Sequence, residues 1–293
     1  MDLSLRRTML FIPGNNPAML QNGGVFGADS VILDLEDAVA PTEKDAARFL
    51  IAHALRTVDY GSSEKVVRIN PLDTFAAEDI KAIVPCCPDA ILVPKVESAA
   101  DIHAAVQMIA GAERPNQTPV KIIALLETPR GIIEAYNIAL ADPRVVALAL
   151  GAEDYTAGLG ALRTKEGTEI FTARTIVVNA AAAADVQSID TPFTDANDDE
   201  GLLIDTQLAK HLGFKGKLSI NPRQIEDIHT VFNPSISDID WAEQVIDAIN
   251  KAQAEGSGVA SLNGKMVDLP VVNRAKRTLH LAQLLGLIKE AAQ

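Results

Sequence analysis

A short apolar run gives way to carboxylates at Val31-Ile32-Leu33-Asp34-Leu35-Glu36-Asp37. Aliphatic residues that are followed by polar ones are typical of a buried parallel strand and the loop after it. Seven further runs of this kind occur, at residues 9–12, 66–69, 90–93, 122–126, 146–150, 186–189 and 218–220. The centres of successive runs lie on average about 30 residues apart, which is the size of one βα unit.

Longer segments with helical periodicity separate these runs, and the alternation of strands and helices predicts a parallel sheet. One such segment begins with Ser98 and has Asp101 three residues later, which is the form of a capping box. Eight units predict an α/β fold, a (β/α)8 TIM barrel over residues 1–236. A doubly wound open sheet remains the alternative, because strand order is not readable from one sequence. Residues 237–293 predict a C-terminal helical extension that packs on a neighbouring subunit.

Composition excludes several classes of protein. Hydrophobic residues make up 48% of the 293 positions and charged residues 22%, which is enough for a buried core and excludes a disordered chain. A net charge of −13 repels phosphate backbones, so we expect no nucleic-acid partner. The longest apolar runs are too short to span a membrane, and the N-terminus lacks an export segment. We therefore expect a cytoplasmic protein without a membrane contact.

The residues that follow the apolar runs are largely polar, and a barrel of this kind brings them together at one rim. Carboxylates crowded at such a rim must be protonated, paired with bases or bound to a hard cation. Mg²⁺ fits better than Zn²⁺, because none of the five histidines ends a run and no His or Cys cluster has zinc spacing. A salt bridge at the rim is the alternative for any single carboxylate.

Five of these segments, in this order along the chain, closely resemble the citrate lyase β-subunit family of citryl-ACP lyases, within the HpcH/HpaI aldolase superfamily. The resemblance spans about residues 6–230 and continues in the tail. The segments are Met9-Leu10-Phe11-Ile12-Pro13-Gly14-Asn15-Asn16-Pro17, Asp34-Leu35-Glu36-Asp37-Ala38-Val39, Val67-Arg68-Ile69-Asn70-Pro71, Gly151-Ala152-Glu153-Asp154-Tyr155 and Ile220-Asn221-Pro222-Arg223-Gln224-Ile225.

The resemblance implies roles for particular residues. Glu127 and Asp154 match the family's two metal ligands and are expected to hold Mg²⁺ in an incomplete shell that the substrate completes. Arg68 matches the arginine that contacts substrate oxygens. The backbone amides of Gly151 and Ala152 match a site at which related enzymes bind a carboxylate.

Other assignments stay open at this point. The proton of the substrate hydroxyl is expected to go to Asp37 or Glu36, but the related hydroxy-dioate aldolases have a histidine base where this chain has Asp37. Lys95 is expected to help balance the charge of an anionic substrate, with a salt bridge to Asp37 or Glu36 as the alternative. In the tail, Asp268 matches an acidic residue that reaches a neighbouring subunit and returns a proton in trans.

The activity that the resemblance implies is Mg²⁺-assisted cleavage of a citryl thioester to oxaloacetate and an acetyl thioester, a retro-aldol type of lyase reaction in citrate fermentation. The implied partners are an acyl carrier protein subunit and the α, or transferase, subunit of citrate lyase, and the chain is expected to form a homotrimer. A free-standing malyl-CoA or citramalyl-CoA lyase or synthase is the main alternative. An aldolase with Lys95 as a Schiff-base nucleophile and a non-catalytic scaffold subunit are more remote ones.

Overall fold

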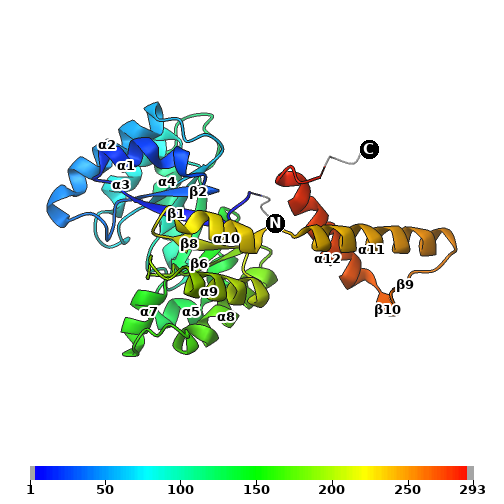
Figure 1. The fold of residues 1–293 in the computed structure, drawn as a ribbon. Coiled ribbons are helices and arrows are strands. Elements are labelled where there is room, and N and C mark those ends of the chain that lie inside the picture. The colour runs from blue at the N-terminus through cyan, green and yellow to red at the C-terminus, as the bar shows by residue number, and fades with distance from the viewer. Residues whose placement is uncertain (1–3, 289–293) are drawn as a thin grey trace. The chain divides into compact units, whose positions relative to one another are not determined.

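The structure, a computed structural model, describes residues 4–288. In this range eight parallel strands close into a barrel in chain order, and β1 pairs with β8 (Figure 1). The closed sheet confirms the predicted barrel and excludes the doubly wound alternative. The strands are β1 (Thr8–Pro13), β2 (Ser30–Asp34), β3 (Glu64–Arg68), β4 (Ala90–Val93), β5 (Lys121–Leu126), β6 (Val145–Leu150), β7 (Gln187–Asp190) and β8 (Gly216–Ser219).

Each predicted run overlaps a strand, but residues without an apolar side chain also join the ladder at strand starts, as at β3 and β8. β3 begins at Glu64, which pairs in register with Ser30 of β2. β8 begins at Gly216, where a Cβ would lie only 1.7 Å from the carbonyl oxygen of Arg6. Glu64 is ion-paired with the buried Arg6, and Gly216 is in close contact with the Arg6 backbone. Neither position is apolar, so a search for apolar runs places the starts of both strands too late.

The barrel has two apolar layers. Side chains inside it form one cluster, whose members include Met9, Ile32 and Leu218. Their strand neighbours point outward and pack beneath the helices; Leu10 and Val31 are examples. Successive residues of a strand face opposite sides of the sheet, and here both sides are buried. This double burial is why the strands appear in the sequence as continuous apolar runs.

Helices connect the strands and cover the outside of the barrel (Figure 1). They are α1 (Pro17–Asn22), η1 (Gly23–Phe26), η2 (Pro41–Glu43), α2 (Lys44–Thr57), α3 (Ala76–Ile83), η3 (Val84–Cys86), α4 (Ala99–Ala112), α5 (Pro129–Ile133), α6 (Ala135–Ala139), α7 (Ala152–Leu159), η4 (Thr168–Ile170), α8 (Phe171–Ala183), α9 (Asp199–Leu212) and α10 (Gln224–Phe232). The capping box predicted for α4 is wrong. The Ser98 hydroxyl donates to the Asp101 carboxylate at 3.0 Å, and that carboxylate accepts the Glu97 amide instead of the Ser98 amide.

Polar residues close the N-terminal end of the barrel. The buried guanidinium of Arg6 donates to both carboxylate oxygens of Glu64, at 2.7 and 2.6 Å. The Ser30 hydroxyl donates to the same carboxylate at 2.8 Å. With apolar side chains filling the interior above them, these residues leave the opposite, C-terminal end of the strands as the place for a site.

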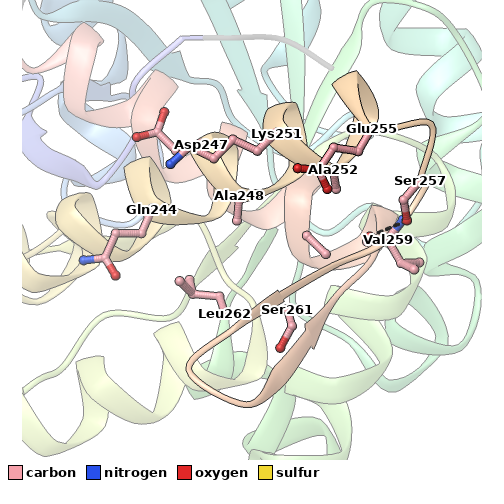
Figure 2. Close-up of a pocket in the computed structure, with 11 residues that line it drawn as sticks. Gln244, Asp247, Ala248, Lys251, Ala252, Glu255, Ser257, Val259, Ser261 and Leu262 are labelled. Carbon is pink, nitrogen blue, oxygen red and sulfur yellow. Dashed lines mark hydrogen bonds between the residues drawn. The ribbon is translucent and has the colours of Figure 1, made fainter.

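The chain divides into two compact units, one up to His229 and one from Thr230 onward, whereas the sequence placed the boundary after residue 236. The second unit holds α11 (Ile236–Ala254), β9 (Ala260–Leu262), β10 (Lys265–Val267) and α12 (Leu269–Leu284), with a small apolar core of its own. A groove of about 580 Å³ runs between α11 and residues 257–262, which include β9 (Figure 2). Among the helices described, none is both long and apolar enough to cross a membrane.

Candidate active site

A cavity of about 460 Å³ opens at the C-terminal ends of the barrel strands. The predicted site residues Asp37, Arg68, Glu127, Gly151, Ala152 and Asp154 all line it. The wall contributed by β1, β8 and the loops after β7 and β8 is apolar and contains Phe11, Pro192, Leu218 and Ile220. The cavity therefore has a charged side and an apolar side.

Asp34, the last residue of β2, is a site residue that the sequence analysis did not assign. Its carboxylate accepts two parallel hydrogen bonds from Arg68, one from Nε at 2.7 Å and one from Nη2 at 2.6 Å. It also accepts the backbone amides of Glu36 and Ala38, at 2.8 and 3.2 Å. Asp34 thus fixes both the guanidinium and the acidic loop after β2. The feature of the sequence that could have indicated this role is the position of Asp34 at the end of an apolar run.

Arg68 is enclosed on its other sides as well. Its Cζ lies 4.7 Å from the centroid of the Phe11 ring, in a cation–π contact. Its Nη1 lies 3.1 Å from Glu36 and 3.4 Å from Asp37. Burial alone would lower the pKa of Arg68, but the bonds and charges of Asp34, Glu36 and Asp37 raise it far above its usual value. The side chain is a permanently charged, immobile donor at the cavity wall.

Glu36 and Asp37 occupy different environments. The Glu36 side chain is only 5% exposed, and both of its oxygens lack a hydrogen-bond donor despite the nearby Arg68. Burial raises the pKa of Glu36 to about 7 against the opposing charges of Arg68 and Lys95. The loop is held by Lys44, whose ammonium donates to the carbonyls of Leu35 and Glu36. Asp37 is 63% exposed at the side chain and faces the cavity.

Lys95 lies between the acidic residues. Its Nζ is 3.6 Å from Glu36 and 3.8 Å from Asp154, and its backbone has a left-handed φ of 53°. The backbone amide of Lys95 donates to Oε2 of Glu127 at 3.1 Å. Burial would lower the pKa of Lys95, but the surrounding carboxylates outweigh it and raise the pKa. A protonated amine is not a Schiff-base nucleophile, so the geometry favours the predicted salt bridge, with Asp154 in place of Asp37 as second partner.

Glu127 is almost completely buried, at 5% exposure, directly after β5. Burial raises its pKa to about 8, with the nearby charges of Glu36 and Asp154 acting in the same direction and Arg68 opposing. A Cβ on Gly151 would lie 2.5 Å from Cγ of Glu127, so position 151 has room for glycine alone. Asp154, on the first turn of α7, has a side chain that is 47% exposed.

The amides of Gly151 and Ala152 already have acceptors. The Gly151 amide donates to the carbonyl of Leu126 at 3.0 Å, and the Ala152 amide donates to Oγ1 of Thr191 at 3.1 Å. A substrate carboxylate would have to displace these acceptors to bind either amide as predicted. Thr191, which follows β7 and also lines the cavity, had no signal in the sequence.

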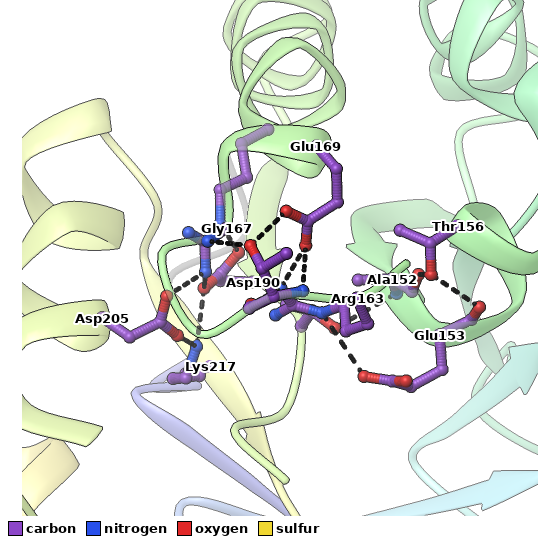
Figure 3. A network of polar contacts seen from close by, with 12 residues as sticks. Ala152, Glu153, Thr156, Arg163, Gly167, Glu169, Asp190, Asp205 and Lys217 are labelled. Carbon is purple, nitrogen blue, oxygen red and sulfur yellow. Dashed lines mark hydrogen bonds and ion pairs between the residues drawn. The ribbon is translucent and has the colours of Figure 1, made fainter. Parts of the chain in front are cut away.

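A second polar network lies beside the cavity (Figure 3). Lys217 and Arg174, both fully buried, each contact the carboxylates of Asp190 and Asp205 at 2.6–2.8 Å. Farther out, Arg163 joins Glu169 at 2.6 Å and Glu153 at 3.4 Å, and Figure 3 shows both carboxylates on its two sides. The first network joins β7, β8, α8 and α9, and the second joins the loop before α8 to the start of α7.

The donor set fits a hard divalent cation with an incomplete protein shell. Within residues 4–288 no group of three or more His, Cys, Asp or Glu side chains is arranged to hold a metal ion. Two carboxylates, Glu127 and Asp154, nevertheless line one cavity, and the buried oxygens of Glu36 beside them lack donors. Mg²⁺ is commonly held by one or two carboxylates, with water and substrate oxygens completing the shell. The five histidines lie on helices.

Asp268 belongs to the second unit. It precedes α12, and its carboxylate accepts the Val271 amide at 3.3 Å as the helix N-cap. The predicted role in a neighbouring subunit is therefore not part of the cavity geometry and stays a prediction.

Comparison with known proteins agrees with this geometry. The model of the HpcH/HpaI aldolase/citrate lyase family matches residues 7–222. The citrate lyase subunit beta of Leuconostoc mesenteroides subsp. cremoris is 50% identical over 288 residues, which cover 97% of this chain and 95% of the relative. A (3S)-malyl-CoA thioesterase of Cereibacter sphaeroides is 34% identical over 284 residues, covering 97% and 96%.

Among solved structures, CitE from Mycobacterium tuberculosis in complex with magnesium, acetoacetate and coenzyme A superimposes with a TM-score of 0.78. It is 32% identical in sequence, and the match covers 95% of this chain and 98% of that one. The fold, the family model and the relatives agree with the resemblance found in the sequence. The chain belongs to the HpcH/HpaI aldolase/citrate lyase family.

Proposed function

We propose that this chain is a Mg²⁺-dependent carbon–carbon lyase that cleaves a citryl thioester into oxaloacetate and an acetyl thioester. One observation carries the proposal: a single cavity is lined by Glu127 and Asp154, by the immobilised Arg68, and by apolar side chains from β1, β8 and the loops after β7 and β8. Carboxylates and guanidinium suit the hydroxy-acid half of the substrate. The apolar wall suits the acyl arm. The 50% identity to a citrate lyase β subunit, against 34% to the malyl-CoA thioesterase, favours citrate over the main alternative.

Glu127 and Asp154 would hold the metal ion. When bound, Mg²⁺ acts as a Lewis acid toward the hydroxyl and carboxylate oxygens of the substrate and lowers the pKa of the hydroxyl. The protein contributes the burial of Glu127, which leaves this carboxylate in need of a counter-charge. The amide of Lys95 donates to Oε2 of Glu127 and so orients the carboxylate that would hold the cation.

Arg68 would stabilise the negative charge that forms on the substrate hydroxyl oxygen when its proton is removed, before that oxygen becomes the carbonyl oxygen of the oxo acid. Its bonds to Asp34 and its contact with Phe11 hold the guanidinium in place before the substrate arrives, so no reorganisation is needed as charge develops. One preorganised donor of this kind typically contributes about 3–4 kcal/mol to transition-state stabilisation. Lys95, between Glu36 and Asp154, adds a second positive charge next to the metal ligands.

Asp37 is the better placed of the two candidate bases. It faces the cavity with an exposed carboxylate, whereas the oxygens of Glu36 are buried beneath Arg68 and Lys95. We assign Asp37 to take the proton of the substrate hydroxyl. Glu36 would hold the side chains of Arg68 and Lys95 in place. A proton must then reach the enolate carbon of the acetyl thioester, and the proposed donor is Asp268 of a neighbouring subunit.

A substrate carboxylate would bind at the N-terminus of α7. Gly151 and Ala152 line the cavity there, and the first turn of the helix also presents the amides of Glu153 and Asp154, which as first-turn donors lack intrahelical acceptors. Binding at Gly151 or Ala152 themselves would require displacement of Leu126 or Thr191 as acceptor.

The proposed setting is a citrate lyase complex, in which an acyl carrier protein delivers the thioester and the α subunit acts as transferase. A homotrimer would place Asp268 of one copy at the cavity of the next. The proposed location remains the cytoplasm. A scaffold role is disfavoured because every proposed charged group of the barrel site is present in one cavity or contacts it.

The test offers the full chain citryl-CoA, malyl-CoA and citramalyl-CoA separately, each with Mg²⁺, and follows release of oxaloacetate, glyoxylate and pyruvate. We expect oxaloacetate from citryl-CoA at the highest kcat/KM, since coenzyme A and a carrier protein present the same pantetheine arm. Preferred release of glyoxylate or pyruvate would reject citrate as the substrate. The Glu127→Gln chain is the matched control and should release none of the three.

A further inference from the structure

Helix α7 begins at the active-site cavity without a capping side chain of its own. Its N-cap residue is Gly151, which has no side chain to accept the first amides of the helix. Serine, threonine, aspartate and asparagine are the residues that usually do so. All of them are excluded here, because a Cβ at position 151 would overlap Glu127. Because Glu127, a proposed metal ligand, occupies this space, α7 cannot have an N-cap side chain at position 151.

Thr191 supplies the cap from the loop that follows the neighbouring strand β7. Its Oγ1 accepts the Ala152 amide at 3.1 Å, although the two residues are 39 positions apart in sequence. Thr191 and Ala152 both have no solvent exposure in the structure, so this amide depends on the Thr191 hydroxyl as its acceptor. An unsatisfied buried amide costs about 1–3 kcal/mol, which makes this single bond a strong constraint on where α7 begins.

The backbone of Thr191 is itself anchored. The preceding residue, Asp190, accepts Lys217 Nζ at 2.7 Å and Arg174 Nη2 at 2.8 Å inside the barrel wall. Figure 3 shows this buried cluster at the end of β7, with Ala152 at the start of the helix beside it. The Thr191 hydroxyl therefore lies next to a buried carboxylate that two cationic side chains hold in place.

Asp154 depends on this anchor more than Glu127 does. It is the third residue of α7, and its half-exposed carboxylate has the 3.8 Å ion pair with Lys95 as its contact in the described structure. An ion pair of that length and exposure constrains a side chain weakly. The position of the carboxylate is therefore set mainly by the backbone of the first helical turn.

We infer that Thr191 is a positioning residue for the proposed metal pair: its hydroxyl oxygen fixes the start of α7 and thereby places the Asp154 carboxylate opposite Glu127. This inference rests on the proposed function, in which Glu127 and Asp154 share one cation. Thr191 touches neither the cation nor the substrate in this role.

The experiment compares Thr191→Val, which keeps the shape and removes the acceptor, with Thr191→Ser, which keeps the acceptor. Thr156→Val is the matched control, because the buried Thr156 hydroxyl donates to the carbonyls of Ala152 and Glu153 in the same helix without capping it. Binding of Mn²⁺ to the full chain without substrate is followed by electron paramagnetic resonance. We expect the dissociation constant to rise about fivefold in Thr191→Val and to stay near the wild-type value in the other two.

An unchanged Mn²⁺ affinity in Thr191→Val, or an equal loss in Thr156→Val, would overturn the inference and leave Thr191 a structural residue. If the valine variant does not fold, Thr191→Cys gives the same test, since sulfur is a weak acceptor. A wild-type chain that binds no Mn²⁺ would instead overturn the proposed function and the inference together. The two failures are therefore distinguishable.

Discussion

Asp34 and Arg68 form a parallel two-bond pair across neighbouring strands, with Nε–Oδ1 and Nη2–Oδ2 distances of 2.7 and 2.6 Å. β2 and β3 set this pair directly, because Asp34 and Arg68 are opposite each other in the strand register. The strand register therefore orients the Arg68 guanidinium, and the loop after β2 contributes its other contacts, Glu36 and Asp37.

Arg68→Lys should therefore impair the reaction although it keeps the charge. An ammonium cannot form the two parallel bonds to Asp34, so the donor loses its fixed orientation. We expect kcat for oxaloacetate release to fall about 10²-fold or more. Arg48→Lys, at an arginine that pairs with Asp79 at 2.9 Å away from the cavity, is the control. Equal activity of the two variants would contradict the role of Arg68.

Glu127→Gln should abolish Mg²⁺ binding and lysis while the fold remains intact. The amide matches the carboxylate in shape but lacks the charge that a hard cation requires. Isothermal titration with Mg²⁺ and thermal unfolding of the same sample separate the two effects. Glu153→Gln, at the exposed carboxylate next to Asp154, should leave binding nearly unchanged. Full activity of the wild-type chain in excess EDTA would contradict the proposed role of Mg²⁺ in the reaction.

Lys217→Met should destabilise the barrel strongly. Removal of this fully buried ammonium leaves Asp190 and Asp205 with Arg174 as their remaining cation. Breaking a buried ion network typically costs about 3–5 kcal/mol of unfolding free energy. Urea unfolding measures the loss, and Lys165→Met, at an exposed lysine that pairs with Asp198, should change little. A Lys217→Met chain as stable as wild type would show that the network is not needed for stability.

Lowering the pH should remove the contribution that the Glu169 carboxylate makes to the stability of the folded state. Burial alone would raise the pKa of Glu169, but hydrogen bonds from Thr164 and Arg163 lower it to about 2. A carboxylate with a lowered pKa stabilises the folded state above its unfolded pKa of roughly 4.5, and this gain is lost as the pH falls toward 2.

Glu169→Gln should therefore lower Tm by about 2–4 °C at pH 7, which corresponds to about 1 kcal/mol for a protein of this size. The difference from wild type should shrink below pH 4.5 and vanish near pH 2. Differential scanning calorimetry across this range is the measurement. Glu166→Gln, at an exposed carboxylate of the same loop, should show no such pH-dependent difference. A Glu169 effect that is constant with pH would contradict the charge-based explanation.

The sequence was sufficient for the barrel because both faces of each strand are buried. Runs such as residues 90–93 consequently coincide with a strand, here β4. Grouping of Arg68, Glu127 and Asp154 in one cavity also follows, since parallel strands bring their C-terminal ends to one rim. What identified their chemistry was the resemblance to a family, because polar strand ends alone are equally consistent with salt bridges.

Other features could not be predicted because they depend on pairing across strands. The bond from Ala152 to Thr191 spans 39 residues and involves a threonine that ends no apolar run. Gly151 appears in the sequence as a possible amide donor, whereas its decisive property is the absence of a side chain beside Glu127. At Ser98 the local pattern predicts a capping box, in which the hydroxyl would accept the Asp101 amide. In the structure the hydroxyl instead donates to the Asp101 carboxylate.

The closure of the barrel by Arg6 and Glu64 has a consequence for the order of events during turnover. With one end sealed and the interior packed, ligands share a single entrance at the opposite rim. Glu127 and Arg68 are the deeply buried members of the cavity, whereas Asp37 and Asp154 are nearer to solvent. In the proposed function the oxo acid would contact the deeper pair, Glu127 and Arg68, and would lie behind the thioester arm. We expect the acetyl thioester to withdraw first and the oxaloacetate to diffuse out last.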